Sequence, residues 1–353
     1  TVTTQSGCNW TASNSNQNFV SILSGSLGSG SGTVFYSVAQ NTSSFSRSET
    51  LVVAGRAFTV QQDGAVVSPP PPTSPNGARF DYDGDGRADV SVFRPSNGTW
   101  YILRSSNNSF YGSGFGQNGD LITPADFDGD RRADLAVFRP SNGTWYYLNS
   151  STGQFVGRQF GQAGDIPAAG DFDSDGRADV SVFRPSNGTW YRLNSSTGQF
   201  VAAQFGQAGD IPVIGDFDGD ARSDLTVFRP SNGAWYIMRS STGSFYAVSF
   251  GQSGDIPAAA DFDGDQRTDV SVFRPNGGYW YRLHSSNNAF ASQQFGTFGD
   301  KPAAADFDGD GRADAAVFRP SNGNWYMQRS ASGFAGVQFG IAGDAPTPSL
   351  TMP

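Results

Sequence analysis

The pattern of apolar and polar residues becomes a strict repeat at residue 76, and each 45-residue segment from there contains four strand-sized runs. In the third segment three of these runs are Val-Ser-Val-Phe-Arg-Pro (180–185), Ser-Asn-Gly-Thr-Trp-Tyr (186–191) and Phe-Val-Ala-Ala-Gln-Phe-Gly (200–206). Short alternating runs separated by turn residues predict β-strands. The Asn187-Gly188 pair is the favoured two-residue hairpin turn. The segments therefore predict antiparallel sheets of four strands.

Four strands in about 45 residues is typical of a β-propeller blade, and no 3.6-residue pattern favours a helical solenoid. The first run, such as 258–260, is Ala-rich, as needed where blades crowd a central axis. Residues 76–80 supply the inner strand of the first blade but lack the preceding Gly-Asp turn, which residues 343–346 supply at the other end. The ends complement each other, and no repeat is left for a seventh blade. We predict an all-β fold with a six-bladed propeller over residues 76–353.

Residues 1–67 differ, because they contain no such repeat. Strand-like runs cover residues 19–23, 33–38, 49–53 and 57–61, and Gly- and Ser-rich turns separate them. This alternation predicts a small β-sandwich. Residues 68–75 are Pro-rich and predict an extended, semi-rigid linker between the two domains.

Each repeat contains a nine-residue segment with Asp at positions 1, 3, 5 and 9, here called an Asp loop and numbered 1 to 6 along the chain. Four carboxylates and the backbone carbonyl of position 7 suit Ca²⁺, which takes six or more oxygen ligands. Asx turns without an ion are the alternative, and Mg²⁺ fits less well because it resists all-protein cages. We predict about six Ca²⁺ ions, one per blade. The predicted ligands are Asp81, Asp83, Asp85, Arg87, Asp89, Asp126, Asp128, Asp130, Arg132, Asp134, Asp171, Asp173, Asp175, Arg177, Asp179, Asp216, Asp218, Asp220, Arg222, Asp224, Asp261, Asp263, Asp265, Arg267, Asp269, Asp306, Asp308, Asp310, Arg312 and Asp314, where each Arg contributes its carbonyl.

The net charge of −9 comes from these loops, which contain most of the Asp residues, and does not indicate an acidic surface. Arg is spread through the repeats without a basic stripe, so we expect no nucleic-acid partner. No long apolar run predicts a membrane span. Open calcium sites usually bind at about 10⁻⁴–10⁻³ M, the range of extracellular calcium. We therefore expect a secreted or cell-surface protein.

Here the motifs resemble a known family. Asp-Phe-Asp-Gly-Asp-Gly-Arg-Ala-Asp, the Val-x-Val-Phe-Arg-Pro that follows, and the Phe-Gly pairs such as Phe160-Gly161 resemble the FG-GAP and VCBS repeats across residues 77–346. The resemblance implies a calcium-binding propeller like those of integrin heads, certain lectins and many secreted bacterial proteins. It does not imply a single function.

The N-terminal domain carries a second resemblance. Cys8-Asn-Trp10, residues 32–39 and residues 53–61 resemble the BACON-like family of bacterial immunoglobulin-like domains. Such domains are usually attached to secreted or surface proteins, several of them proposed to bind glycans. The family normally has another strand before the Cys-x-Trp region, and the chain begins too late to contain it. We expect an incomplete sandwich.

Two further sets of residues recur once per repeat. The Trp of each Trp-Tyr pair either packs in the core or forms a platform that stacks on sugars, and core packing is the favoured alternative. The Arg of each Phe-Arg-Pro motif is expected to pair with a Gly-Asp aspartate in a structural role. The candidate ligand-binding residues are Trp100, Trp145, Trp190, Trp235, Trp280 and Trp325.

The catalytic inventory is thin. His284 is the only His, and we expect it to be an exposed turn residue. The predicted propeller contains no Glu, so a sialidase-like Tyr-Glu pair is absent, and paired-carboxylate hydrolysis would need Asp already used in the loops. From this inventory the chain is predicted not to be an enzyme.

Two functions are left open. The first is a secreted or cell-surface binding and adhesion module, for glycans or another surface ligand. The second is a structural subunit of an extracellular filament or matrix, in which other copies of the chain add a strand to the incomplete N-terminal sandwich.

Overall fold

The computed structural model describes residues 1–14, 18–39, 41, 46–62 and 79–347. It divides into two compact units, Thr1–Pro70 and Pro71–Pro353, called here the N-terminal unit and the repeat unit. Within the described ranges every regular element is a β-strand, so the prediction of an all-β chain is confirmed. The predicted Pro-rich linker at 68–75 lies outside the described residues.

The N-terminal unit has two sheets, ordered β3-β1-β5-β6 and β2-β4. The sequence predicted four of these strands and missed β1, which contains Trp10, and β3, which pairs with β1. A Cβ at Gly28 would lie 2.2 Å from the Trp10 ring, so only Gly allows β3 to pass this close. The strands are β1 (Asn9–Asn14), β2 (Val20–Ser24), β3 (Leu27–Ser29), β4 (Phe35–Val38), β5 (Arg47–Val53) and β6 (Arg56–Gln62).

Glu49 on β5 is the one Glu of the chain and lies inside the N-terminal unit, 4% exposed. Its carboxylate accepts the backbone N–H groups of Asn18, Phe19 and Val20 at 2.9–3.1 Å. A buried charge is tolerated only where hydrogen bonds replace its water. Glu49 therefore joins β5 to the segment that enters β2.

The repeat unit consists of four-stranded antiparallel sheets, and its described residues form six of them. Each is named here by the Asp loop that enters its second strand, so sheet 1 is β30-β7-β8-β9 and sheet 6 is β26-β27-β28-β29. The short first strands are β30 (Ala345–Pro346), β10 (Leu121–Ile122), β14 (Ile166–Pro167), β18 (Ile211–Val213), β22 (Ile256–Pro257) and β26 (Lys301–Pro302). The second strands are β7 (Val90–Arg94), β11 (Leu135–Arg139), β15 (Val180–Arg184), β19 (Leu225–Arg229), β23 (Val270–Arg274) and β27 (Ala315–Arg319).

The outer half of each sheet consists of a third strand, which forms a hairpin with the second, and a fourth strand at the edge. The third strands are β8 (Thr99–Leu103), β12 (Thr144–Leu148), β16 (Thr189–Leu193), β20 (Ala234–Met238), β24 (Tyr279–Leu283) and β28 (Asn324–Arg329). The fourth strands are β9 (Phe110–Gly114), β13 (Phe155–Gln159), β17 (Phe200–Gln204), β21 (Phe245–Ser249), β25 (Phe290–Gln294) and β29 (Gly333–Gln338). The second strands are almost fully buried and the fourth strands are mostly exposed, so each sheet runs from the core outwards.

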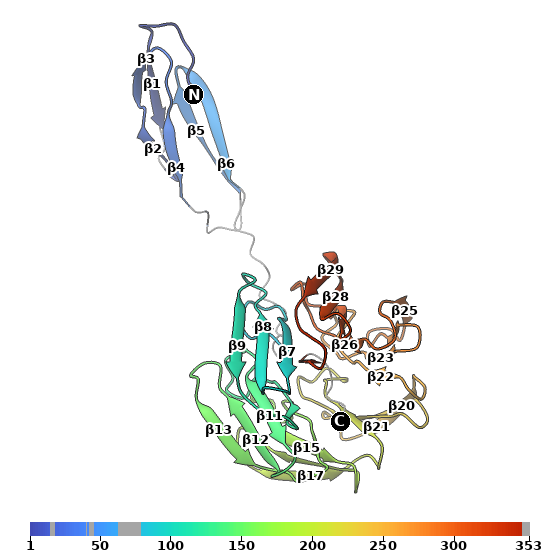
Figure 1. Cartoon of the computed structure of the whole chain (residues 1–353). Coiled ribbons are helices and arrows are strands. Elements are labelled where there is room, and N and C mark those ends of the chain that lie inside the picture. Colours follow the sequence, from blue (N-terminus) through green and yellow to red (C-terminus); the bar gives the residue numbers. More distant parts are fainter. Residues whose placement is uncertain (15–17, 40, 42–45, 63–78, 348–353) are drawn as a thin grey trace. The chain divides into compact units, whose positions relative to one another are not determined.

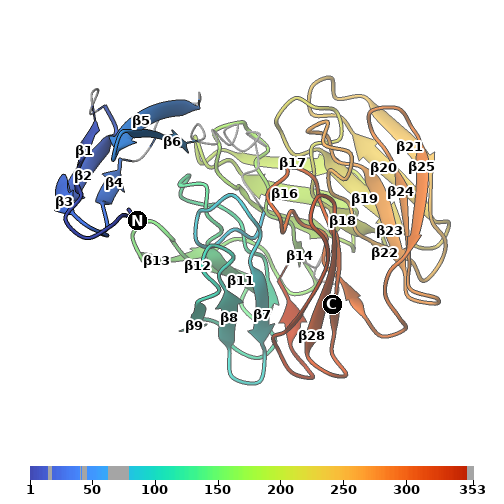
Figure 2. The ribbon, with the colours of Figure 1, turned by 90° about the horizontal axis from the view of Figure 1, so that it is seen from above.

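The sheets follow one another in chain order around the repeat unit, and β28 comes to lie near β7 and β8 (Figures 1 and 2). Apolar side chains fill the space between this last sheet and the first, where Val90 and Val92 of β7 cluster with Phe318 and Trp325. The first strand of sheet 1 comes from the C-terminal end, because β30 pairs with β7. This corrects the prediction that residues 76–80 supply that strand. Of these, residues 76–78 lie outside the described residues, and Phe80 accepts the Asp89 N–H and packs against the apolar cluster.

The six Trp side chains of the Trp-Tyr pairs are 0–2% exposed. Each packs against the Phe of the neighbouring second strand, as Trp190 does with Phe183 at a ring-centroid distance of 5.5 Å. The Trp190 Nε1–H donates to the Phe205 carbonyl at 2.9 Å, so its polar group is satisfied inside the sheet stack. Reading these residues as sugar platforms is therefore wrong, because the core leaves no face of the ring to a ligand. The correction applies to Trp100, Trp145, Trp190, Trp235, Trp280 and Trp325.

Candidate functional site: the Asp loops and the grooves between sheets

The Asp loops are folded by their own carboxylates, as loop 3 (171–179) shows. The Asp171 carboxylate accepts the N–H groups of Ser174 and Gly176 at 2.7 and 2.9 Å. Asp179 accepts the N–H of Phe172 at 3.0 Å with one oxygen and the N–H of Ser195 at 2.6 Å with the other. Positions 1 and 9 thus hold the turn together, and both side chains are buried.

Position 3 is different, because in loops 1, 3, 4 and 6 one of its oxygens has no protein partner. The Oδ1 atoms of Asp83, Asp173, Asp218 and Asp308 are buried and accept no hydrogen bond. A buried carboxylate oxygen without a donor is costly unless a cation lies against it. Carboxylate oxygens of three Asp residues lie within 4.8 Å of one another in loops 1 to 4, at positions 1, 3 and 9 in loops 2, 3 and 4 and at positions 1, 3 and 5 in loop 1. This all-oxygen donor set fits Ca²⁺.

The negative charge of the position-5 carboxylate is partly offset by contacts with position 7 of its own loop. Its Oδ1 accepts the N–H of position 7 in every loop, as Asp175 does from Arg177 at 2.9 Å. In loops 1, 3 and 5 the position-7 side chain also forms an ion pair with it, and the Arg177–Asp175 distance is 2.7 Å. The sequence predicted the position-7 carbonyls as ligands, and that role stays a prediction. What the structure adds is the amide and guanidinium contact.

The loops are also joined to one another. The N–H of position 8 in each loop donates to the position-1 carbonyl of the preceding loop at 2.6–2.7 Å, and the Ala88 N–H of loop 1 donates to Asp306 of loop 6. The position-7 side chain lies over position 4 of the preceding loop, where a Cβ at Gly129 would be 3.0 Å from Arg177. In loop 3 that position is Ser174, and its Oγ accepts the Arg222 Nε–H at 2.8 Å. The six loops therefore form one closed cycle of contacts.

Burial raises the pKa of the position-9 carboxyls, although backbone hydrogen bonds act in the opposite direction and the position-3 carboxylate adds to the increase. The pKa of Asp89 and Asp179 is raised to about 6, and that of Asp134, Asp224 and Asp314 to about 7. Burial also raises the pKa of Asp261, at position 1 of loop 5, to about 6. Carboxyls with raised pKa resist ionisation unless a cation is near.

Sequence reasoning missed the Ser pair that follows each third strand. In sheet 3 the Ser196 Oγ–H donates to Asp173 Oδ2 at 2.6 Å, and the Ser195 N–H reaches Asp179. These contacts fix the second oxygen of position 3 and leave the first oxygen for an ion. The signal was available, because the pair recurs every 45 residues as 105–106, 150–151, 195–196, 240–241 and 285–286, with Ser330 and Ser332 in the last repeat.

His284 is not the exposed turn residue that the sequence predicts. Its side chain is 20% exposed, and Nδ1 lies 3.3 Å from Asp269 Oδ2 and 3.7 Å from Asp263 Oδ2. The end of β24 carries it back over loop 5, just before Ser285. His284 is therefore part of the loop-5 carboxylate cluster.

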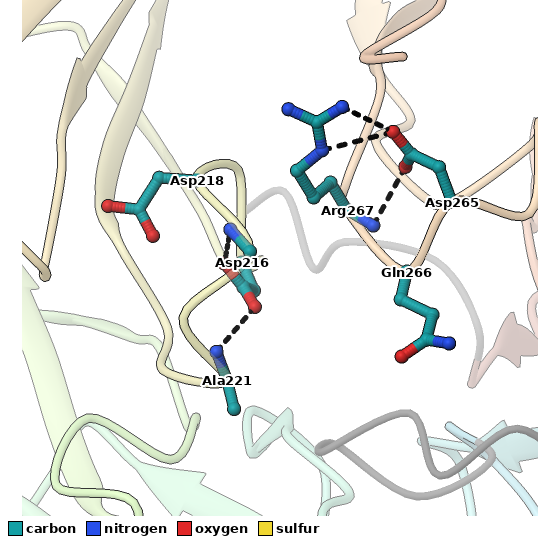
Figure 3. Close-up of a pocket in the computed structure, with 7 residues that line it drawn as sticks. Asp216, Asp218, Ala221, Asp265, Gln266 and Arg267 are labelled. Atoms are coloured by element: carbon teal, nitrogen blue, oxygen red, sulfur yellow. Dashed lines mark hydrogen bonds and ion pairs between the residues drawn. The ribbon is translucent and has the colours of Figure 1, made fainter.

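A cavity of about 580 Å³ opens between loops 4 and 5. Asp216, Asp218 and Ala221 line one side, and Asp265, Gln266 and Arg267 line the other (Figure 3). Ala221 and Gln266 both have positive φ, at 72° and 68°, a conformation that side chains other than Gly rarely adopt. The cavity therefore lies on the face of the unit that carries the Asp loops.

The Arg of each Phe-Arg-Pro motif pairs with a Gly-Asp aspartate, as the sequence predicts. Arg184 donates from Nε and Nη2 to Asp165 at 2.7 and 2.9 Å, and the Asp165 side chain is fully buried. The hydrogen bonds that Arg184 donates to Asp165 raise the pKa of the guanidinium. In sheet 1 the pair is Arg94–Asp344, which joins the two ends of the repeat unit. The other pairs are Arg139–Asp120, Arg229–Asp210, Arg274–Asp255 and Arg319–Asp300.

Each of these Arg residues lies over a Tyr, and in most sheets the Tyr contacts an exposed Phe. In sheet 3 the Arg184 Cζ is 4.4 Å from the Tyr191 ring centroid, and Tyr191 stacks on Phe200 at 6.2 Å. Phe200 is 57% exposed and meets Phe160 of sheet 2 edge-on at 6.3 Å. Comparable Phe side chains, 57–67% exposed, begin or nearly begin every fourth strand: Phe110, Phe155, Phe200, Phe245, Phe290 and Phe334.

Between sheets 2 and 3 these aromatic side chains line a groove with a cavity of about 250 Å³. Its walls are Phe160, Gly161, Val182, Arg184, Tyr191 and Phe200. Gly161 has a φ of 130°, and a Cβ there would lie 2.9 Å from the Phe138 ring, so a larger residue would not fit. The groove combines apolar faces with the Tyr191 hydroxyl, to which the Asn187 amide donates at 2.9 Å.

Six similar four-stranded sheets arranged in sequence, each entered through an Asp loop, define a propeller-like repeat protein. The chain belongs to the FG-GAP-like repeat family, which matches residues 81–137, 126–182, 171–227, 216–272 and 261–317. Each match begins at position 1 of one Asp loop, runs through the next Asp loop and ends in the second strand of the sheet that this next loop enters. No curated protein matches the chain significantly. The BACON-like resemblance of the N-terminal unit stays a prediction.

Solved structures similar to the chain include virginiamycin B lyase from Staphylococcus aureus, at 10% identity and a TM-score of 0.46, covering 72% of this chain and 85% of that one. Another is an Agrocybe aegerita lectin that recognises non-reducing terminal N-acetylglucosamine, at 17% identity and a TM-score of 0.46, covering 72% and 81%. A third is dihydro-heme d1 dehydrogenase NirN, at 16% identity and a TM-score of 0.41, covering 73% and 53%. These similarities concern the fold alone.

The similar structures overturn one prediction. The thin catalytic inventory led to the conclusion that the chain is not an enzyme, yet a lyase and a dehydrogenase are among the structures it resembles. That conclusion is wrong as an inference from this fold.

As for membranes, the described part of the chain offers no helix of the length and hydropathy that a bilayer crossing requires.

Proposed function

We propose that the repeat unit is a six-bladed propeller stabilised by Ca²⁺ and that it acts outside the cell as a binding and adhesion module for glycans. The groove between sheets 2 and 3 is the observation that carries the binding proposal. Sugar rings bind through their C–H faces on aromatic side chains and through their hydroxyls on fixed polar groups. Phe200 and Phe160 offer the former, and the Tyr191 hydroxyl with Asn187 offers the latter.

The dimensions of the groove favour a small group. Pockets for drug-sized ligands have volumes of about 300–1,000 Å³, and this cavity has about 250 Å³. One sugar ring at the end of a chain suits it better than an extended oligosaccharide. Because the Arg–Tyr–Phe arrangement recurs around the unit, weak single contacts would combine into strong attachment to a surface with many copies of the sugar.

Calcium has a structural role in this proposal. The position-3 oxygens without donors, the raised pKa values of the buried carboxyls and the oxygen-only donor sets support an ion in the loops. Position-7 carbonyls would complete the coordination. The closed cycle of loop contacts would transmit this stabilisation to all sheets, because every loop bonds to the one before it.

A glycan array followed by calorimetry in millimolar Ca²⁺ tests the binding proposal. We expect Phe200→Ala to remove one of the binding sites and to lower the stoichiometry without a large loss of stability, because Phe200 is mostly exposed. Replacing the six exposed Phe residues of the fourth strands should abolish binding. Phe298, 85% exposed in a turn outside the groove, provides the control, and Phe298→Ala should bind normally. A blank array, or equal loss with Phe298→Ala, contradicts the proposal.

A second candidate function is a structural subunit of an extracellular filament or matrix, and the surface of the N-terminal unit favours it. Leu23, Leu27 and Phe35 are 61–77% exposed, and Phe58 is 48% exposed. Within the described residues β2 and β4 pair only with each other. An apolar, under-paired sheet of this kind can accept a strand from another copy.

Negative-stain microscopy of the protein in Ca²⁺ tests this candidate. Fibres that disappear with Phe35→Ser and Leu27→Ser would support it. Monomers at all concentrations, with the exposed apolar side chains intact, would contradict it. Glycan binding by such monomers would leave the first proposal in place.

A further inference from the structure

Loop 5 differs chemically from the other Asp loops, because an imidazole lies against its carboxylates. The positions that correspond to His284 in the other repeats are Arg104, Asn149, Asn194, Arg239 and Arg329. His284 Nδ1 and one oxygen each from Asp263 and Asp269 lie within 4.8 Å of one another. The described clusters of loops 1 to 4 consist of aspartate oxygens alone, whereas the loop-5 cluster combines one nitrogen donor with two oxygen donors.

The distances match those of ligands around one ion. A metal bound to nitrogen and oxygen at about 2.0–2.1 Å in tetrahedral geometry holds its ligand atoms about 3.3–3.4 Å apart. Nδ1 lies 3.3 Å from Asp269 Oδ2 and 3.7 Å from Asp263 Oδ2. A ring N–H has one hydrogen to share between these two oxygens, whereas an ion would take all three atoms as ligands.

All four carboxylates of loop 5 accept hydrogen bonds within the protein, and one of them also forms an ion pair. Asp265 is paired with Arg267 at 2.6 Å and also accepts the Ser285 Oγ–H at 2.7 Å. The two Asp261 oxygens accept backbone N–H groups at 2.6 and 2.7 Å. Asp263 accepts the Ser286 Oγ–H at 2.7 Å and Asp269 the Phe262 N–H at 2.9 Å, but these two carboxylates form the cluster with the His284 imidazole. The charge of the two carboxylates balances one divalent cation.

We propose that Asp263, Asp269 and His284 form a site for a transition-metal ion such as Zn²⁺, distinct in selectivity from the calcium loops. Imidazole is a good ligand for Zn²⁺ and its first-row neighbours, whereas Ca²⁺ prefers oxygen alone. Arg282, which lies 4.3 Å over the Phe262 ring, adds positive charge near the site. Loop 3 has the same feature, because Arg192 lies over Phe172, so the two loops differ mainly in His284 against Asn194.

Two reciprocal variants use this match. His284→Asn gives loop 5 the residue of loop 3, and Asn194→His gives loop 3 the residue of loop 5. Both are made in full-length protein with Cys8→Ser, because the exposed Cys8 thiol could bind zinc by itself. Each protein is dialysed against micromolar Zn²⁺ in millimolar Ca²⁺, and its metal content is measured by mass spectrometry.

We expect one Zn²⁺ per chain in the Cys8→Ser protein, none after His284→Asn, and two after Asn194→His. Co²⁺ in place of Zn²⁺ should give visible absorption bands that follow the same pattern and report nitrogen coordination. Zinc that is absent from the Cys8→Ser protein, or that is unchanged by His284→Asn, would overturn the proposal. If His284→Asn fails to fold, the gain of a second ion in Asn194→His still decides it.

Discussion

The two units of this chain are both built from β-strands, yet they are stabilised in different ways. The repeat unit buries polar groups at the same places in every sheet: the position-9 carboxylate of the Asp loop, the aspartate of one Arg–Asp pair and one Trp indole. Among its described residues, the N-terminal unit buries one carboxylate, Glu49, and leaves large apolar side chains such as Leu27 and Phe35 exposed. Repetition gives every sheet of the repeat unit the same buried ion pair, whereas the described part of the N-terminal unit has two small apolar clusters, one around Trp10 and one around Val20.

Removal of calcium should separate the two units most clearly. Six occupied metal sites, including the Zn²⁺ site proposed in loop 5, would contribute about 16 kcal/mol in total if each ion were at 100 times its dissociation constant, and EDTA removes both kinds of ion. We therefore expect excess EDTA to lower the Tm of the repeat unit by about 20 °C or more and to leave that of the N-terminal unit unchanged. Calorimetry with and without chelator measures both transitions. A repeat-unit transition that does not move would remove the calcium role from the proposal.

Acidification of the chelated protein should give the next largest effect, with an unusual sign. The position-9 carboxyls of loops 1, 2, 3, 4 and 6 have a folded pKa of about 6 to 7, above the ordinary 3.8, so between these values the folded state holds more protons than the unfolded state. Their contribution to stability is complete below pH 3.8 and is lost as the pH rises through 6 to 7. The Tm of the calcium-free repeat unit should rise, by on the order of 10 °C, when the pH falls from 7.5 to 5.5.

The Tm of the N-terminal unit should not change with this acidification. Burial alone would raise the pKa of Glu49, but hydrogen bonds from Phe19, Asn14, Val20 and Asn18 outweigh it and lower the pKa below 4.5. Its contribution to stability is present above that value and is lost only in stronger acid. Between pH 7.5 and 5.5 the transition of this unit should stay constant. A fall of both transitions on acidification would show that the loop carboxyls are ionised without metal.

The Arg–Asp pairs test whether repetition makes the sheets equivalent. Arg184→Ala leaves the buried Asp165 carboxylate without its cation and should cost about 2–4 kcal/mol. Arg94→Ala removes the same contact from Asp344, but there it also loosens β30 from β7, so its cost should be at least as large. Urea denaturation in Ca²⁺ measures both. Arg184→Lys is the control and should recover only part, because Lys cannot bond both carboxylate oxygens in parallel.

The sequence predicted the repeat unit much better than the N-terminal unit, and the reason is again repetition. A 45-residue period shows each strand six times, so Val180–Arg184 and its relatives stood out, and so did the Arg184–Asp165 pairing. Residues whose role depends on the return of the chain were missed. Ser196 and His284 lie 23 and 21 residues after the carboxylates they meet, Asp173 and Asp263, and only the closed hairpin brings them together. In the N-terminal unit β3 has three residues and no repeat, so no pattern could reveal it.

Glu49 offers the smallest effect and the most local one. Glu49→Ala would leave the N–H groups of Asn18, Phe19 and Val20 without an acceptor inside the N-terminal unit. Each unmet buried donor destabilises the fold, so the Tm of this unit should fall by about 10 °C. Glu49→Gln keeps one carbonyl oxygen and should fall about half as far. Because the repeat unit has its own core, its calorimetric transition should not change in either variant. If both transitions fell together, the two units would unfold as one cooperative body. The proposed contrast between an ion-dependent repeat unit and an ion-independent N-terminal unit would then no longer hold.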